Sequence, residues 1–173
     1  MKELVILNSE IICPCCGLHL PAGNGYLPNH CDASPECLQV YSDLLCYTVA
    51  KQDEEFIHQH AVDAYAAQHA GGTTRNITVA FGLIGLYLAL EKGYTGKQVQ
   101  RAHMQIAKRR KVWPRLEPPR QRAGVTVMDV LKVQDGMAKD AMIRQWMAAV
   151  WESWADRQAW VRVATDTLLN VRR

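Results

Sequence analysis

The sequence of 173 residues lacks a hydrophobic run long enough to cross a membrane. Its longest apolar stretch, residues 77–91, contains two glycines and falls short of the roughly 20 apolar residues that a membrane span needs. The N-terminus has an apolar run of only four residues and no small-residue cleavage site, so it does not resemble a signal peptide. We therefore expect a cytoplasmic protein that does not associate with membranes.

Sequence fingerprints of common enzymes are also absent. The chain contains no phosphate-binding loop, no dinucleotide fingerprint, and no evident pair of a nucleophile and its base. The histidine motif of zinc proteases and the ordered ligands of zinc deaminases are missing as well. There are no internal repeats or low-complexity segments. With 49% hydrophobic and 21% charged residues, the composition is that of one globular domain over residues 1–173.

Most of the chain follows the period of an α-helix. The pattern predicts helices over 35–50, 53–69, 74–92, 96–110 and 138–171, the last with a break near Asp156. Thr126 and Asp129 form a variant capping box at the start of another helix. Strand structure is expected only within residues 3–12. The sequence thus predicts an all-α, bundle-like fold, in which an irregular cysteine-bearing segment (1–37) precedes a helical body (38–173).

Three helical segments allow finer predictions. The buried face of the first helix is expected to contain Leu38, Tyr41, Leu45 and Val49, with Cys46 as a small core residue. The helix over 74–92 is apolar on all sides, which predicts a central position. The tryptophans of the last helix, Trp151, Trp154 and Trp160, are expected mostly in the core, although a surplus could form a homodimer interface.

Cysteines at short spacing indicate a metal site. Cys13 and Cys16 form a CxxC motif, and Gly17 permits the tight turn found in zinc knuckles, whereas Cys15 is expected to point away. Cys37 lies at the start of a predicted helix, where the helix dipole stabilises a thiolate, and it offers a third ligand. In a reducing compartment such cysteines favour zinc over disulfides, and buried free cysteines are the alternative.

The chain has no second CxxC motif, so the fourth zinc ligand has to be Cys31, His30 or a later histidine. His58 and His69 point the same way from the helix over 53–69. They lie about 16 Å apart along its axis, so only one of them can join the cysteines. The resulting Cys₃His centre would leave no open coordination position, which is the condition for structural zinc.

Four motifs follow one another in the chain: CPCCG, ASPEC, VDAYAAQHAGG and WPRLEPP. Together they resemble an uncharacterised bacterial family classed as a domain of unknown function, over about residues 13–155. The resemblance implies no known activity. It marks the positions Cys13, Cys16, Cys37, His58, Asp63, Tyr65, Gln68 and His69. The chain departs from the family at Leu38, where tryptophan is usual, and at Ala70, where proline is usual, and neither change removes a candidate ligand.

These features support two main hypotheses for function. The first is a non-catalytic helical module with structural zinc that binds or regulates another protein. The second is a metalloenzyme or small-molecule site on the helix over 53–69, because so many polar groups on one helix are costly to bury without a purpose. The candidate residues of that site are His58, Asp63, Tyr65, Gln68 and His69.

A basic segment over residues 97–122 supports a third hypothesis, nucleic-acid binding. It contains nine lysines and arginines against the single acid Glu117, and Trp113 could provide a ring for base stacking. Four of the bases are consecutive: Lys108, Arg109, Arg110 and Lys111. The alternative is a solvated helix face, or one that faces the acidic N-terminal third of the chain.

Overall fold

A computed structural model describes residues 10–23 and 32–170 of the chain. Two short strands and seven helices make up these residues: β1 (Glu10–Ile12), β2 (His19–Pro21), α1 (Pro35–Lys51), α2 (Ile57–Gln68), α3 (Asn76–Lys92), α4 (Gly96–Arg109), α5 (Val127–Leu131), α6 (Met137–Ser153) and α7 (Ala155–Leu169). The predicted all-α class is therefore confirmed. The candidate ligands His30 and Cys31, and the first part of the predicted strand region, lie outside the described residues.

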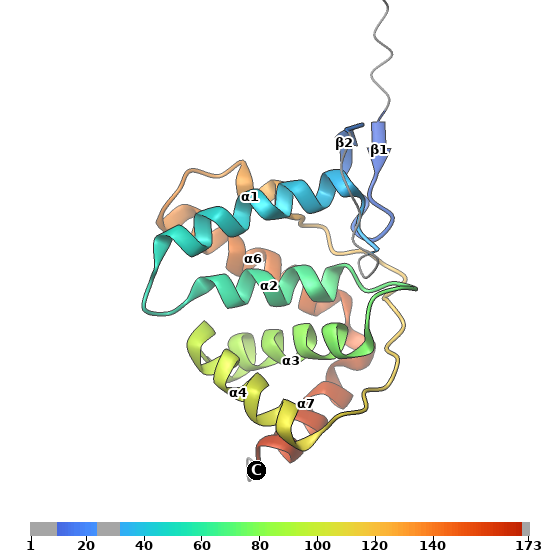
Figure 1. Cartoon of the computed structure of the whole chain (residues 1–173), viewed down its shortest axis with the longest axis vertical. Coiled ribbons are helices and arrows are strands. Elements are labelled where there is room, and N and C mark those ends of the chain that lie inside the picture. Colours follow the sequence, from blue (N-terminus) through green and yellow to red (C-terminus); the bar gives the residue numbers. More distant parts are fainter. Residues whose placement is uncertain (1–9, 24–31, 171–173) are drawn as a thin grey trace, which may run out of the picture.

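The helices form stacked layers. In Figure 1, α1, α2 and α3 lie one below the other, α6 lies behind α2, and α4 and α7 lie at the bottom. The hairpin of β1 and β2 lies beside the beginning of α1 and the end of α2. These three chain segments supply the candidate metal ligands, so the stacking of α1 on α2 positions the site.

The second strand, β2, was not predicted from sequence. The loop after β1 reverses the chain, and Ile11 then pairs with Leu20 in an antiparallel register. Strand structure therefore extends to Pro21, beyond the predicted limit at residue 12. The two strands can pair only because the chain reverses between them. The turn-forming residues after β2 do not predict this reversal.

Helix α1 has the predicted extent, but its buried face differs from the prediction. Its buried side chains are Cys37, Tyr41, Leu44 and Thr48. Cys46 is exposed and Val49 is 55% exposed, so the prediction that these two residues are buried is wrong. Because Cys37 points at the site, the residues one, two and three turns after it form the inner face.

Helix α2 begins later than the predicted residue 53. Phe56 adopts a left-handed backbone conformation (φ 57°) that interrupts the helix before Ile57. The Ile57 N–H donates to the two carboxylate oxygens of Asp53 at 3.1 and 3.3 Å. The acidic residues at 53–55 therefore precede the helix, where Asp53 satisfies a backbone donor of the first turn.

Helix α3 occupies the centre, as predicted from its apolar sequence. It contacts α2, α4, α6 and α7. Two glycines allow α2 to approach closely: a Cβ atom at Gly82 would lie 2.8 Å from the Asp63 carbonyl oxygen, and one at Gly85 would lie 2.0 Å from Asp63 Oδ2. The backbones of α2 and α3 thus pack nearer than larger side chains would permit.

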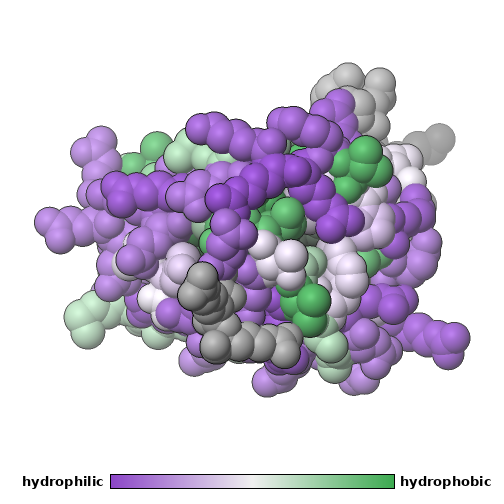
Figure 2. All heavy atoms as spheres, turned by 90° about the horizontal axis from the view of Figure 1, so that it is seen from below, coloured by the Kyte–Doolittle hydropathy of each residue, from purple (hydrophilic) through white to green (hydrophobic). Residues whose placement is uncertain are grey.

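The last predicted helix is divided into α6 and α7 at Trp154, two positions before the predicted break. Trp151 and Trp154 are buried as expected, and Trp160 is partly buried against the core. No helix in the described ranges is both long and apolar enough to cross a membrane. The face seen from below is mostly hydrophilic, with a few separate hydrophobic areas (Figure 2).

Candidate metal centre

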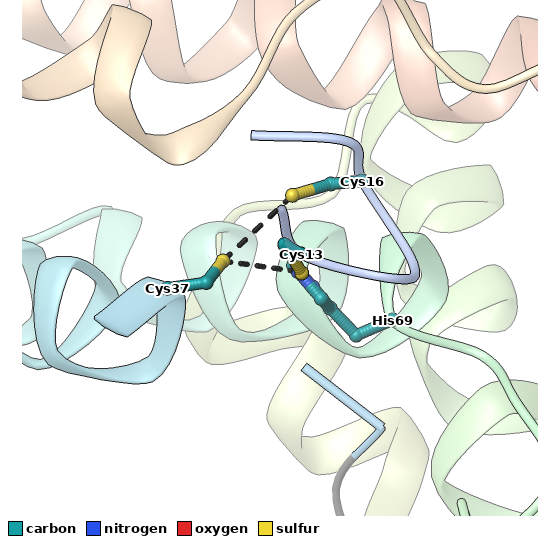
Figure 3. A group of neighbouring side chains, drawn as sticks. All are labelled: Cys13, Cys16, Cys37 and His69. Atoms are coloured by element: carbon teal, nitrogen blue, oxygen red, sulfur yellow. Dashed lines mark hydrogen bonds between the residues drawn. The ribbon is translucent and has the colours of Figure 1, made fainter. Parts of the chain in front are cut away.

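Four buried side chains converge where the hairpin meets α1 and α2: Cys13, Cys16, Cys37 and His69 (Figure 3). Their ligand atoms all lie within 4.8 Å of one another. The Sγ atoms of Cys16 and Cys37 are 3.7 Å apart, and Cys37 Sγ lies 3.3 Å from His69 Nε2. We call these four residues the Cys₃His cluster.

The dimensions of the Cys₃His cluster fit a tetrahedral metal ion. Zinc binds thiolate sulfur at about 2.3 Å and imidazole nitrogen at about 2.0 Å, so a regular tetrahedron has S–S edges of about 3.8 Å and S–N edges of about 3.5 Å. Two of the six separations between ligand atoms, 3.7 and 3.3 Å, are close to these edges, and none exceeds 4.8 Å. The four side chains could therefore hold a metal ion in their present arrangement.

The loop formed by residues 13–17, which we call the CxxC loop, brings its two cysteines to one side. The Cys13 N–H donates to the Leu18 carbonyl and the Gly17 N–H donates to the Cys13 carbonyl, both at 2.9 Å. Gly17 has a φ of 78°, a conformation that glycine adopts without the steric penalty of a Cβ atom. Hydrogen bonds between near neighbours in the sequence therefore position Cys13 and Cys16, which are half of the cluster.

Cys37 is held in the first turn of α1. Ser34 is the N-cap, and its hydroxyl accepts a hydrogen bond from the Cys37 N–H at 3.1 Å. Pro35 at the start of the helix favours the same backbone geometry. The positive end of the helix dipole stabilises a thiolate at this position.

His69 ends α2, and its ring is oriented by its own helix. His69 Nδ1 lies 2.9 Å from the Tyr65 carbonyl oxygen, to which it donates in the tautomer that leaves the Nε2 lone pair facing Cys37. The Tyr65 ring stacks on His69 at 3.9 Å and on Tyr41 at 3.7 Å. The Tyr65 hydroxyl also donates to Cys37 Sγ at 3.9 Å. Tyr65 thus supports two members of the cluster.

The three thiols change one another's pKa values in opposite directions. Hydrogen bonds from Cys16 and Cys37 hold the pKa of Cys13 well below its usual range. The hydrogen bond to Cys13, together with burial, raises the pKa of Cys16 to about 11 and that of Cys37 well above the usual range. One thiolate therefore forms readily, whereas further thiolates need a cation beside them, as in a metal–thiolate centre.

A family model described as a family of unknown function (DUF5946) matches residues 11–155. The chain belongs to this family. The match confirms the resemblance inferred from the sequence, and its range includes all four members of the Cys₃His cluster. No curated protein and no solved structure matches the chain.

Two residues near these ligands in sequence lie outside the Cys₃His cluster. His58, which was predicted as an alternative to His69 for the fourth ligand, has its Nδ1 atom 2.8 Å from the Thr48 hydroxyl oxygen. It lies about three helical turns before His69, which places it at the other end of α2. The Cys15 thiol donates to the Asp32 carbonyl at 3.2 Å, in agreement with its expected direction away from the cluster.

Asp63 and Gln68 connect α2 to neighbouring segments. Asp63 is buried against α3, accepts a hydrogen bond from Gln59 Nε2 at 3.0 Å, and has a pKa raised by burial. The Gln68 amide donates to the Val125 carbonyl at 2.7 Å and accepts from Trp146 Nε1 at 2.9 Å. Both side chains therefore have structural partners in positions apart from the cluster.

Trp113 lies in the interior, so the prediction that it offers a ring for base stacking is wrong. It is only 5% exposed and packs edge-on against Phe81, with ring centroids 5.3 Å apart. The Arg110 guanidinium lies over the same ring at 5.0 Å. The proline-containing connection after α4 turns this ring inward, a placement that the sequence run of basic residues does not reveal.

The four consecutive bases at 108–111 lie at the end of α4 and just beyond it. Lys108 and Lys111 are exposed, and the Lys111 ammonium donates to the Ala107 carbonyl at 2.6 Å. Arg109 donates to the Leu168 carbonyl at the end of α7. These contacts are with backbone oxygens of the same protein, and nucleic-acid binding by this segment stays a prediction.

Sequence reasoning missed Asp32, which holds the turn after His69. Its carboxylate accepts hydrogen bonds from the backbone N–H groups and hydroxyls of Thr73 and Thr74 at 2.7–3.2 Å. The Thr74 hydroxyl is also 2.9 Å from the His69 carbonyl oxygen. The contact joins residues more than 40 positions apart, and no local sequence signal announces it.

Proposed function

We propose that the protein is a non-catalytic helical module that binds one structural zinc ion through the Cys₃His cluster. The observation that carries the proposal is that four buried ligand atoms, all within 4.8 Å of one another, suffice to fill a tetrahedron. Such a site has no open position for water or substrate. Three thiolates and an imidazole are a soft ligand set that favours zinc over magnesium or calcium.

Zinc would stabilise the fold by fastening the hairpin to the helices. An isolated two-stranded hairpin is marginally stable in water, and β1 and β2 pair over only three positions. A zinc ion bound by the CxxC loop, Cys37 and His69 joins this hairpin to the start of α1 and the end of α2. Its binding free energy would then contribute directly to folding.

The contacts of the polar residues on α2 support a structural role for this helix. His58 is paired with Thr48, and Gln68 is shared between a backbone carbonyl and a tryptophan. Asp63 faces the glycines of α3. A metalloenzyme on this helix would need several of these groups beside the metal, whereas each has a partner elsewhere.

Hydrogen exchange of zinc-loaded and chelator-treated protein tests the proposal. We expect zinc removal to increase exchange in residues 10–23 and at the first turn of α1, because these segments depend on the ion. The amides in the interior of α3 should retain their protection. Unchanged exchange of the hairpin after complete removal of zinc would contradict a structural role.

A further inference from the structure

A cavity of about 380 Å³ lies beside the CxxC loop. It is formed by segments that are distant in sequence, including Pro14, Gln68, Gly71, Arg120, Arg122 and Trp154. Its size is within the range of about 300–1,000 Å³ that is usual for small-molecule sites. A larger hollow of about 810 Å³, formed around residues 117–124, shares several of these lining residues, but Glu117, Glu152 and Asp156 also line it, so the excess of positive charge belongs to the smaller cavity.

Arg122 is fixed at the side of this cavity by the CxxC loop. Its Nη2 atom donates to the Pro14 carbonyl at 2.9 Å, and a Cβ atom at Gly17 would lie 2.8 Å from its Nη1 atom. A guanidinium carries five N–H donors, so this hydrogen bond leaves most of them available. The loop thus presents a cation in a defined position.

Arg120 supplies a second positive charge to the same cavity. Within the described part of the chain, its exposed side chain has no hydrogen bond and no carboxylate within ion-pair distance. The carboxylate in the lining, Asp32, is engaged by the donors of Thr73 and Thr74. These hydrogen bonds do not cancel the negative charge of Asp32, so with the two arginines the lining of the cavity carries a net positive charge of one.

We propose that this cavity binds a small anion through a phosphate or carboxylate group held between Arg120 and Arg122. Guanidinium groups match both kinds of anion, because their parallel N–H donors can contact two oxygens at once. The ligand would lie beside the Cys₃His cluster without contacting the metal. The site gives the protein a binding activity in addition to the proposed structural zinc.

Calorimetric titration of the zinc-loaded protein with inorganic phosphate and, separately, with succinate tests this site at constant ionic strength. We expect saturable binding of at least one probe. Arg120→Gln should weaken it at least about tenfold, which corresponds to the loss of one charge-assisted hydrogen bond. Arg101→Gln, which removes an exposed base on α4 outside the cavity, should leave the affinity unchanged.

The two probes also identify the ligand class. Binding of phosphate alone indicates a phosphorylated ligand, binding of succinate alone indicates a carboxylate, and binding of both indicates a general anion site. Because Arg120 has no hydrogen bond or ion pair among the described residues and its side chain is exposed, its replacement should leave the fold intact. The proposal is overturned if neither probe binds saturably, or if Arg120→Gln binds as tightly as the unchanged protein. Either failure leaves the zinc proposal intact, because the protein is tested with zinc bound.

Discussion

The Nε2 atom of His69 lies 3.3 Å from the Sγ atom of Cys37, although the two residues are 32 positions apart in the sequence. The other ring nitrogen of His69 lies 2.9 Å from the Tyr65 carbonyl oxygen, so the last turn of α2 fixes the tautomer that faces the thiol. This relationship selects His69 over His58 as the histidine of the Cys₃His cluster. It also explains why α1 and α2 have to be packed together before the Cys₃His cluster is complete.

Replacement of the two histidines should separate their roles. We expect His69→Ala to lose zinc, because it leaves only three ligands, and His58→Ala to retain it, because His58 contacts Thr48 instead. Zinc content per chain, measured by mass spectrometry of the metal, gives the comparison. Full zinc content in His69→Ala would place the fourth ligand elsewhere, and loss of zinc from His58→Ala would contradict the separate role of His58.

Gln68 is expected to contribute to stability without affecting metal content. Gln68→Met removes the partners of the Val125 carbonyl and the Trp146 indole, and the loss of two partly buried hydrogen bonds should lower the free energy of unfolding by about 1–3 kcal/mol. Urea unfolding of the zinc-loaded protein measures the change. Gln145→Met, at an exposed position on α6, is the matched control. Loss of zinc from the Gln68 variant would show that this residue acts on the cluster.

Because α2 packs closely on α3, a larger residue at Gly85 is expected to destabilise the protein. A Cβ atom there would lie 2.0 Å from Asp63 Oδ2, so Gly85→Ala should destabilise the protein by about 1–3 kcal/mol through overpacking. Gly124→Ala, where a Cβ atom has nothing within 4 Å, should have little effect. Thermal unfolding of the two variants tests this difference. Similar melting temperatures would contradict the observed packing.

His103 should make the protein less stable in mild acid. Burial lowers its pKa to about 4 in the folded state, against about 6.5 in an unfolded chain. As the pH falls from about 6.5 to 4, the unfolded state gains a proton that the folded state does not, so stability decreases by up to about 3 kcal/mol. His103→Gln cannot gain this proton and should show a smaller decrease. Parallel stability curves for the two proteins over this pH range would contradict the assignment.

The sequence predicted those parts of the cluster that depend on local interactions. The CxxC turn with Gly17 and the capped start of α1 at Cys37 are each built within a few residues, and their sequence signals are correspondingly clear. The fourth position was left open between several residues. Choosing His69 requires the packing of α2 against α1, which is a long-range relationship.

The incorrect predictions also concern long-range packing. A helical period locates a face only approximately, and the inner face of α1 is set by the direction of Cys37, which leaves Cys46 and Val49 outside the core. Trp113 lies in a segment rich in bases, yet its ring is buried against Phe81. The composition of a segment shows which residues are neighbours in the sequence. It does not show which residues pack together in the folded protein.

Zinc stoichiometry is the most direct test of the central proposal. In protein purified without added metal, we expect about one zinc ion per chain, as a closed four-ligand site requires. Cys37→Ser should lose the zinc, whereas Cys46→Ser, which changes an exposed cysteine of the same helix, should retain it. Less than about half an equivalent of zinc in the unchanged protein, or full zinc content in Cys37→Ser, would contradict the proposed centre.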